Sequence, residues 1–214
     1  MTHQVNHSRV SSKGNRFSAG SRKIRIIKRA KVDPEKVKVF KYLNNNLDVE
    51  TGGNLDFEKG KLERMSVDFG SNDGLDIVNN DDWEGDWHTH VNPVVEEFLP
   101  SDDDIYSFVT NPTKKVSVIW WMDNTLMLNK TPKFDSWVRG KSKSQIKSII
   151  KSINNKSEND VSSFVDKMKD NKMSVDDVKK LTEQYNNRLN KLGLVASVNT
   201  RNKELQEIPL EVVI

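Results

Sequence analysis

Hydrophobic and polar positions along residues 23–138 switch between strand and helix spacing. Helical spacing predicts helices over 33–46, with Asp33 as N-cap, and over 101–111. Alternating or short apolar runs predict strands over 23–32, 47–57 (interrupted at Gly52-Gly53), 61–70 and 86–90, and a hairpin over 114–129 with Asp123-Asn124 as its turn. This order predicts an α/β (α+β) domain over 23–138.

In the C-terminal third of the chain, the spacing of the apolar residues becomes helical. Apolar residues at helical spacing predict amphipathic helices over 141–155, 157–170 and 174–193. We therefore expect a helical extension over 139–193, followed by terminal strands within 194–214 that can return to the sheet. Residues 1–22 are rich in Ser, Asn, Gly and basic residues, which predicts a disordered basic arm.

Composition narrows the class of protein. The 214 residues include no cysteine, so a disulfide framework and a thiol nucleophile are excluded, and a zinc site must use His, Asp, Glu and water. The sequence shows neither the apolar core of a secretory signal nor a run long enough to cross a membrane. We expect a soluble, cytoplasmic protein without a membrane partner.

Charge is distributed unevenly. Residues 1–31 carry nine Lys/Arg and no Asp/Glu, whereas residues 48–104 carry seventeen Asp/Glu against three Lys/Arg. The basic arm is compatible with nucleic acid as a partner. The acidic segment would attract cations or basic peptides.

The stretch GDWHTHVNPVVEEFLPSDDD (residues 85–104) concentrates candidate metal ligands. If 86–90 is a strand, His88 and His90 point to the same face and can reach one metal ion. The alternative is a pair of histidines on a solvated face. Ser101 and Asp104 have the spacing of a capping box at a helix start. The competing interpretation is that the Asp104 carboxylate is the third metal ligand, after the two histidines.

His-x-His, ten intervening residues and Ser-x-x-Asp, preceded by Glu50 in ETGGNL, resemble the motif of the JAMM (MPN+, JAB-domain) zinc metalloproteases over about residues 34–130. The resemblance implies an MPN/JAB-like, cytidine-deaminase-like mixed sheet flanked by helices. It also implies one Zn²⁺ per chain held by His88, His90 and Asp104. Glu50 would be the general base, and Ser101 would stabilise the oxyanion.

The same resemblance implies hydrolysis of a peptide or isopeptide bond, for example in a ubiquitin-like conjugate. The alternative is a non-catalytic MPN-type scaffold, or a nucleoprotein-interaction module that uses the basic arm and the C-terminal helices. The chain departs from the family in having Val91 after the second histidine and a longer spacer before Ser101.

Four hydrophobic residues near this stretch are candidates for substrate contact: Trp83, Val94, Val95 and Phe98. The spacer that holds three of them could grip substrate or tuck into the core as an ordinary connection. Among the three further tryptophans, Trp87 and Trp120 are the candidates for core packing. Trp87 is expected in the core, whereas Trp120 and Trp121 are adjacent in a strand, so one should face inward and the other outward.

Overall fold

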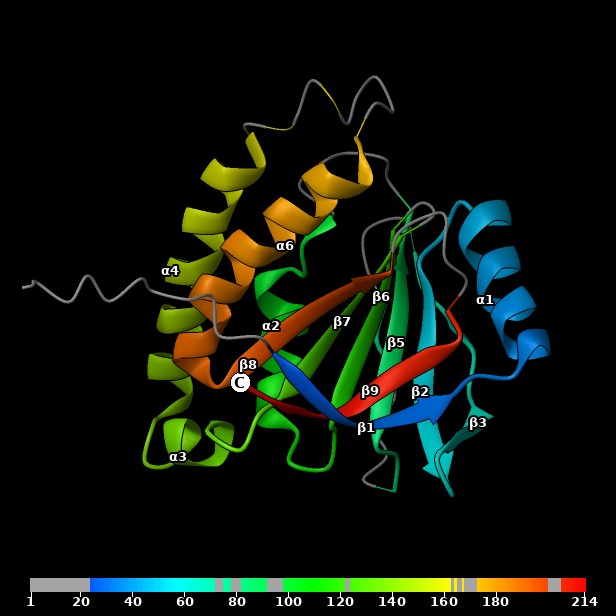
Figure 1. Ribbon diagram of the computed structural model, residues 1–214, viewed down its shortest axis with the longest axis horizontal. Helices are drawn as coiled ribbons and strands as arrows, with labels where there is room; N and C mark the ends of the chain where they lie inside the picture. The colour runs from blue at the N-terminus through cyan, green and yellow to red at the C-terminus, as the bar shows by residue number, and fades with distance from the viewer. Residues whose placement is uncertain are drawn as a thin grey trace, which may run out of the picture.

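The elements of the fold are seen in a computed structural model that describes residues 24–71, 75–77, 82–91, 98–121, 124–162, 164, 167, 173–199 and 205–214 (Figure 1). The strands are β1 (Arg25–Lys31), β2 (Thr51–Glu58), β3 (Lys61–Met65), β4 (Asp68–Phe69), β5 (Gly85–His90), β6 (Val116–Trp121), β7 (Asn124–Lys130), β8 (Leu194–Asn199) and β9 (Glu207–Val213). The helices are α1 (Pro34–Asn46), α2 (Asp102–Thr110), α3 (Phe134–Val138), α4 (Lys143–Ser162) and α6 (Val175–Leu189), with the 3-10 turn η2 (Asn190–Leu192).

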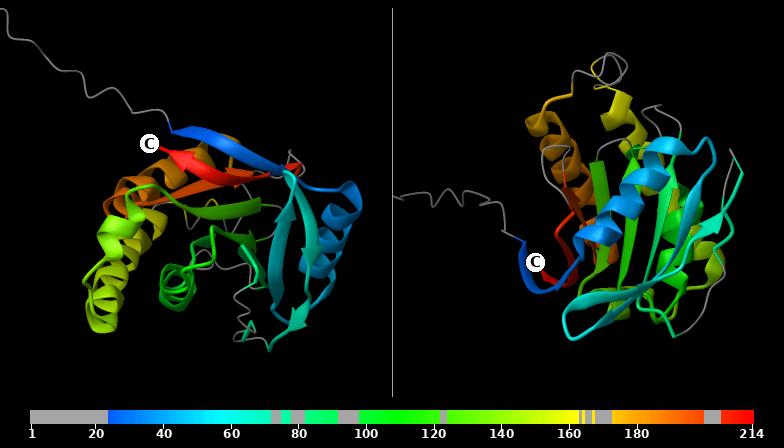
Figure 2. Two further views of the ribbon diagram at one scale, coloured as in Figure 1. Left: turned by 90° about the horizontal axis from the view of Figure 1, so that it is seen from below. Right: turned by 90° about the vertical axis from the view of Figure 1, so that its right-hand side faces the viewer.

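The strands form one mixed sheet in the order β8-β7-β6-β5-β2-β3-β1-β9, and β4 pairs with β2. The central pair β5-β6 is parallel, and α2 connects its two strands. The sheet curls until β9 approaches β7, where Asn129 Nδ2 donates to the Pro209 carbonyl oxygen at 2.5 Å (Figure 2). The result is a nearly closed, barrel-like sheet, so the predicted mixed α/β class is confirmed.

Both faces of the sheet are covered. On one face α1 inserts Phe40, whose ring lies 4.9 Å from Trp87 and 5.3 Å from Trp120. On the other face α2, α4 and α6 share a hydrophobic core with β6, β7 and β8. Trp121 belongs to that second core and is 5% exposed, so the expectation that Trp120 or Trp121 faces outward was wrong. The reason is that helices from the C-terminal third cover the second face.

Strand β2 runs through Gly52 and Gly53, where an interruption was expected. A Cβ atom at Gly53 would collide with the Ser66 backbone, and one at Gly52 would lie 2.9 Å from His88 Cβ. The glycines therefore let neighbouring chain segments approach a continuous strand. The predicted strand 61–70 is instead divided into β3 and β4 around Ser66, whose Oγ accepts from Asn54 N at 2.8 Å.

Two boundaries differ from their predictions. Asn124 pairs with Trp121 as the first residue of β7, so it belongs to the strand and not to the predicted turn, whereas Asp123 lies outside the described part of the chain. Helix α4 continues through 155–157, where two separate helices were expected. The cap of α1 is confirmed, because Asp33 accepts from Glu35 N at 2.8 Å.

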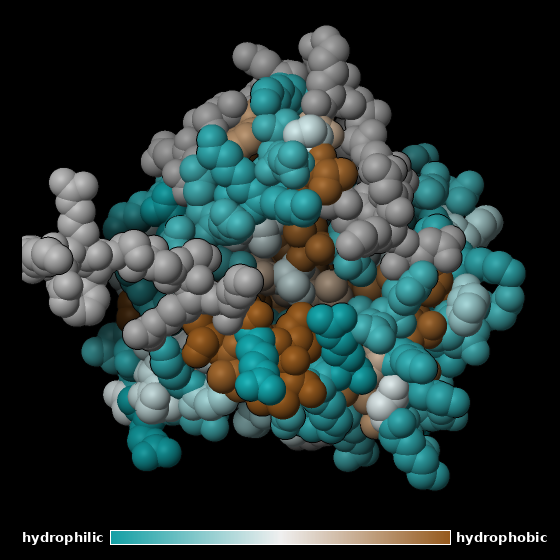
Figure 3. Space-filling view, viewed as in Figure 1, coloured by the Kyte–Doolittle hydropathy of each residue, from teal (hydrophilic) through white to brown (hydrophobic). Residues whose placement is uncertain are grey.

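The remaining expectations concern a membrane-spanning segment, the character of the surface and the N-terminal arm. The described residues include no helix that is long and apolar enough to cross a membrane. The surface in Figure 3 is mostly hydrophilic, with hydrophobic side chains gathered where β1 and β9 lie. The predicted arm over 1–22 lies outside the described residues.

Candidate metal centre

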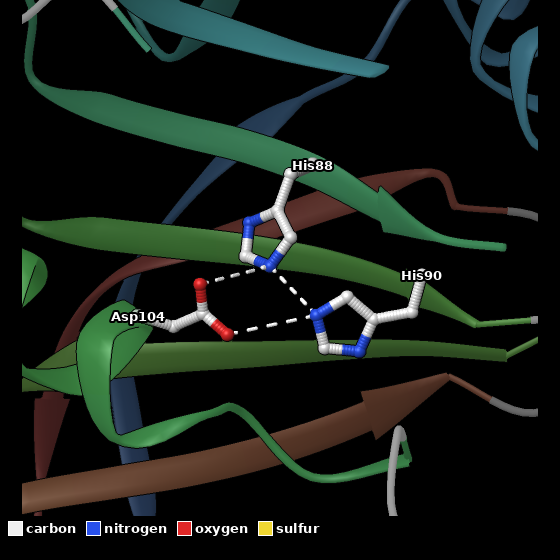
Figure 4. Close-up of side chains that lie close together, drawn as sticks. All are labelled: His88, His90 and Asp104. Carbon is white, nitrogen blue, oxygen red and sulfur yellow. Dashed lines mark hydrogen bonds and ion pairs between the residues drawn. The ribbon is translucent and has the colours of Figure 1, made fainter. Parts of the chain in front are cut away.

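Two secondary-structure elements bring the candidate ligands together. The period of two in β5 sets His88 and His90 on the same face, and both side chains are buried. Helix α2 begins beside that end of β5, and Asp104 in its first turn points between the two imidazoles (Figure 4). The three residues are a group whose ligand atoms lie within 4.8 Å of one another.

The distances fit a tetrahedral ion. His88 Nε2 lies 3.0 Å from His90 Nε2 and 3.4 Å from Asp104 Oδ1, and His90 Nε2 lies 3.6 Å from Asp104 Oδ2. Ligands at about 2.0–2.1 Å from tetrahedral zinc would be about 3.3 Å apart, within this range. An imidazole and a carboxylate each supply a lone pair here, and two N–H hydrogens cannot both occupy the short gap between the nitrogens. The donor set therefore suits a shared cation such as zinc.

The electrostatics of the group are strongly coupled. Burial lowers the pKa of His88, but attraction to Asp104 and a hydrogen bond with it outweigh burial, so this pKa is raised overall. Burial raises the pKa of Asp104, but attraction to His88 and hydrogen bonds from both histidines hold it well below its usual value. Asp104 is therefore ionised across the physiological range and is available as an anionic ligand.

Ser101 and Asp104 form the predicted capping box. Ser101 Oγ accepts from Asp104 N at 3.1 Å, and Asp104 Oδ2 accepts from Ser101 N at 2.8 Å. The capping box thus uses the same carboxylate that faces the two histidines, so capping does not exclude a ligand role for Asp104. Because Ser101 Oγ acts only as an acceptor in this bond, its O–H remains a donor for another group.

Helix α6 carries a second capping box with the same residue types. Ser174 Oγ accepts from Asp177 N at 3.1 Å, as Ser101 does in α2. Its aspartate, however, pairs with Lys167 at 2.8 Å. Ser-x-x-Asp alone therefore caps a helix, and the two histidines distinguish the start of α2.

Glu50 lies directly before β2, beside the histidine strand. Gly52 pairs with His88 in antiparallel register, so continuing that register by two residues sets Glu50 opposite His90. Its backbone N–H donates to Ser71 O at 3.1 Å, and its carbonyl accepts from Gly70 N at 2.8 Å. The charge of Glu50 also contributes to raising the pKa of His88, which places the carboxylate within electrostatic reach of the centre.

Thr51 and Thr89 join the two strands beside the centre. The Thr89 hydroxyl oxygen accepts from Thr51 N at 2.9 Å and lies 3.2 Å from the Thr51 hydroxyl. Both threonines are buried, so these bonds are shielded from water. They fix the segment that carries Glu50 against the segment that carries the histidines.

The sequence did not single out a buried cation near the other end of β5. Lys114 is 1% exposed, and its Nζ donates to Asn54 Oδ1 and, at 2.9 Å, to Gly85 O. It also attracts Asp86, whose carboxyl hydrogen-bonds with Ser117 and has a pKa raised by burial. In sequence Lys114 is half of a Lys-Lys pair that resembles a solvated surface, so no local pattern marks it.

Of the four residues predicted to contact substrate, the structure describes Phe98 and Trp83, and it places them in different parts of the fold. Phe98 is 1% exposed and packs edge-on against Trp121 at 5.5 Å, so it belongs to the core and not to an exposed binding surface. Trp83 precedes β5, at the end away from His90, and the Arg64 guanidinium lies 5.0 Å from its ring. Val94 and Val95 lie outside the described residues.

Comparison with known proteins finds no matching family model, no matching curated protein and no matching solved structure. The resemblance to the JAMM metalloproteases therefore rests on the residues named above.

Proposed function

We propose that this chain is a zinc-dependent metallopeptidase or isopeptidase with an MPN/JAB-like fold. The observation that carries the proposal is the convergence of His88, His90 and Asp104 at distances suited to one tetrahedral ion. The positions of Glu50 and Ser101 beside that group add support, because hydrolysis also needs a base and an oxyanion donor.

The roles are those that the resemblance to the JAMM metalloproteases implies for these residues. His88, His90 and Asp104 would hold the ion, which when bound polarises the substrate carbonyl and lowers the pKa of water toward about 7. Glu50 takes a proton from the attacking water and passes it to the leaving amine. The Ser101 hydroxyl donates to the oxyanion of the tetrahedral intermediate, which stabilises the transition state.

The substrate would be a protein or peptide, for example a ubiquitin-like conjugate. Support for a basic partner comes from the excess of acidic residues over 48–104, which surrounds the histidines in sequence. An acidic surface raises the local concentration of a basic chain before it binds.

The decisive test compares wild-type protein with Glu50→Gln, both loaded with zinc and assayed on ubiquitin-like conjugates and on a peptide library. We expect kcat/KM to fall at least ~100-fold while zinc content stays at one ion per chain, because a general base contributes about 10²–10⁴-fold. Glu35→Gln, an exposed change in α1, is the control. Equal cleavage by wild type and Glu50→Gln would exclude the mechanism.

A second candidate function is a non-catalytic scaffold that binds nucleic acid. It is favoured by β1, where Arg25, Lys28, Arg29 and Lys31 are all exposed along one strand that continues the basic N-terminal segment. A scaffold should retain its partner after zinc is chelated. Nucleic-acid retention that falls with salt and is insensitive to chelation, without any cleavage, would favour this function over the peptidase.

A further inference from the structure

A cavity of about 390 Å³ lies beside the start of α2, next to the middle and end of α4. Its volume falls within the range of small-ligand pockets, about 300–1,000 Å³. Ser101 belongs both to its wall and to the capping box that holds Asp104, so the cavity adjoins the metal centre. Its floor and walls combine residues of the Asp104 helix with residues of the C-terminal helical region.

The cavity has a negative charge. Asp102 and Asp103 line it, and none of the described residues in its wall is basic. The N-terminus of a helix carries about half a positive charge, which is smaller than the charge of two carboxylates. The balance therefore favours a cationic occupant and opposes a phosphate or carboxylate.

A buried carboxamide supplies a second indication. Asn154 of α4 is 8% exposed and lines the cavity, where its Nδ2 donates to the Pro100 carbonyl oxygen at 3.1 Å. Its Oδ1 has no hydrogen-bond partner within the described part of the chain, and Asp102 Oδ1 shares that property. Buried acceptors without donors are costly, at about 1–3 kcal/mol each, so this wall is suited to a ligand rich in N–H donors.

The remaining walls are apolar. Leu99 and Val161 line the cavity together with these polar groups. A lysine or arginine side chain has this combination of a hydrocarbon stem and a donor-rich cationic end. A small inorganic cation would leave the apolar walls without a contact.

We propose that the cavity formed by the start of α2 and by α4 is a specificity subsite that binds a lysine or arginine side chain of the substrate. Because Ser101 caps α2 and its Oγ accepts from Asp104 N at 3.1 Å, the cavity wall adjoins a proposed metal ligand, so the bound basic residue lies within a few residues of the scissile bond. The assignment to a peptide substrate rests on the proposed peptidase function, whereas cation binding does not.

The test uses full-length, zinc-loaded Glu50→Gln protein and blocked tripeptides Ac-Ala-X-Ala-NH₂, with X as lysine, arginine, norleucine or glutamate. Titration calorimetry should show binding of the lysine or arginine peptide at least ~10-fold tighter than the norleucine peptide. Comparing lysine with arginine identifies the preferred cation. Asp103→Asn and Asn154→Leu should each weaken this binding at least ~5-fold.

The matched control is Asp176→Asn, because Asp176 occupies the same second position of α6 that Asp103 occupies in α2. It should leave binding unchanged, and melting curves should confirm that all variants are folded. Equal binding of the norleucine peptide, an equal effect of Asp176→Asn, or no binding of the basic peptides would overturn the subsite. Cleavage is measured separately with zinc-loaded wild-type protein. Binding of the basic peptides by Glu50→Gln without any cleavage by wild type would refute the peptidase function alone. Cleavage by wild type that does not depend on basic residues would refute the subsite alone.

Discussion

Gly52 lies directly opposite His88 in the antiparallel pair β2-β5, with no room for a side chain between them. A Cβ atom there would lie 2.9 Å from His88 Cβ and closer still to the Trp87 carbonyl oxygen. The position of one proposed metal ligand thus depends on the absence of a side chain on the neighbouring strand.

Replacing Gly52 with alanine should therefore displace β5. We expect a loss of about 1–3 kcal/mol in the free energy of unfolding, typical of overpacking, together with loss of zinc binding. Gly140→Ala is the control, since it has open space around it but a φ of 76°, and should cost about 1–2 kcal/mol while zinc still binds. Unfolding in urea and zinc titration measure the two effects, and full zinc affinity in Gly52→Ala would contradict the argument.

Zinc should stabilise the folded chain through His88, His90 and Asp104. At a free concentration about 100 times the dissociation constant, a ligand adds about 2.7 kcal/mol, which should raise Tm by roughly 5–10 °C in a chain of this size. His88→Ala and Asp104→Asn should abolish the shift. Asp177→Asn, which alters the corresponding aspartate of the other capping box, should retain it; an equal loss there would show that the effect is not specific to the centre.

Lys114 is predicted to be essential for stability. In Lys114→Met, Asn54 Oδ1 and Gly85 O lose a buried donor, and each unpaired acceptor costs about 1–3 kcal/mol. The adjacent Lys115 is half-exposed and pairs with Glu84, so Lys115→Met should cost less than about 1 kcal/mol. Chemical denaturation of both variants measures the two losses of stability. Similar denaturation midpoints for Lys114→Met and Lys115→Met would contradict the prediction.

Asp177 should give an acid-dependent contribution to stability. Hydrogen bonds from Lys167 and Ser174 lower its pKa to about 2 in the folded state, below an unfolded value of about 3.9. The contribution is therefore present above about pH 4 and is lost as pH falls through about 2. The difference in unfolding free energy between wild type and Asp177→Asn should shrink over this interval, and a difference that stays constant down to pH 2 would contradict the argument.

Local patterns predicted the grouping of His88, His90 and Asp104 better than they predicted the surroundings of this group. The period of two in β5 places His88 and His90 on one face, and capping preferences place Asp104 in the first turn of α2; both are short-range properties of the chain. The burial of Trp121 and Lys114 depends on distant elements that cover them, so no pattern within their own strands contains it. The pairing of Gly52 with His88 is likewise a matter of register between segments far apart in sequence.

The capping box of α2 would lower the entropy cost of binding an ion. Ser101 fixes the Asp104 carboxylate through the capping box, so this proposed ligand is held in one orientation before any ion binds and would lose little rotamer entropy on binding. The affinity of the proposed centre for a metal ion would then depend on fraying of the first turn of α2. A partner or substrate that tightened or loosened that single turn would tune metal occupancy without touching either histidine.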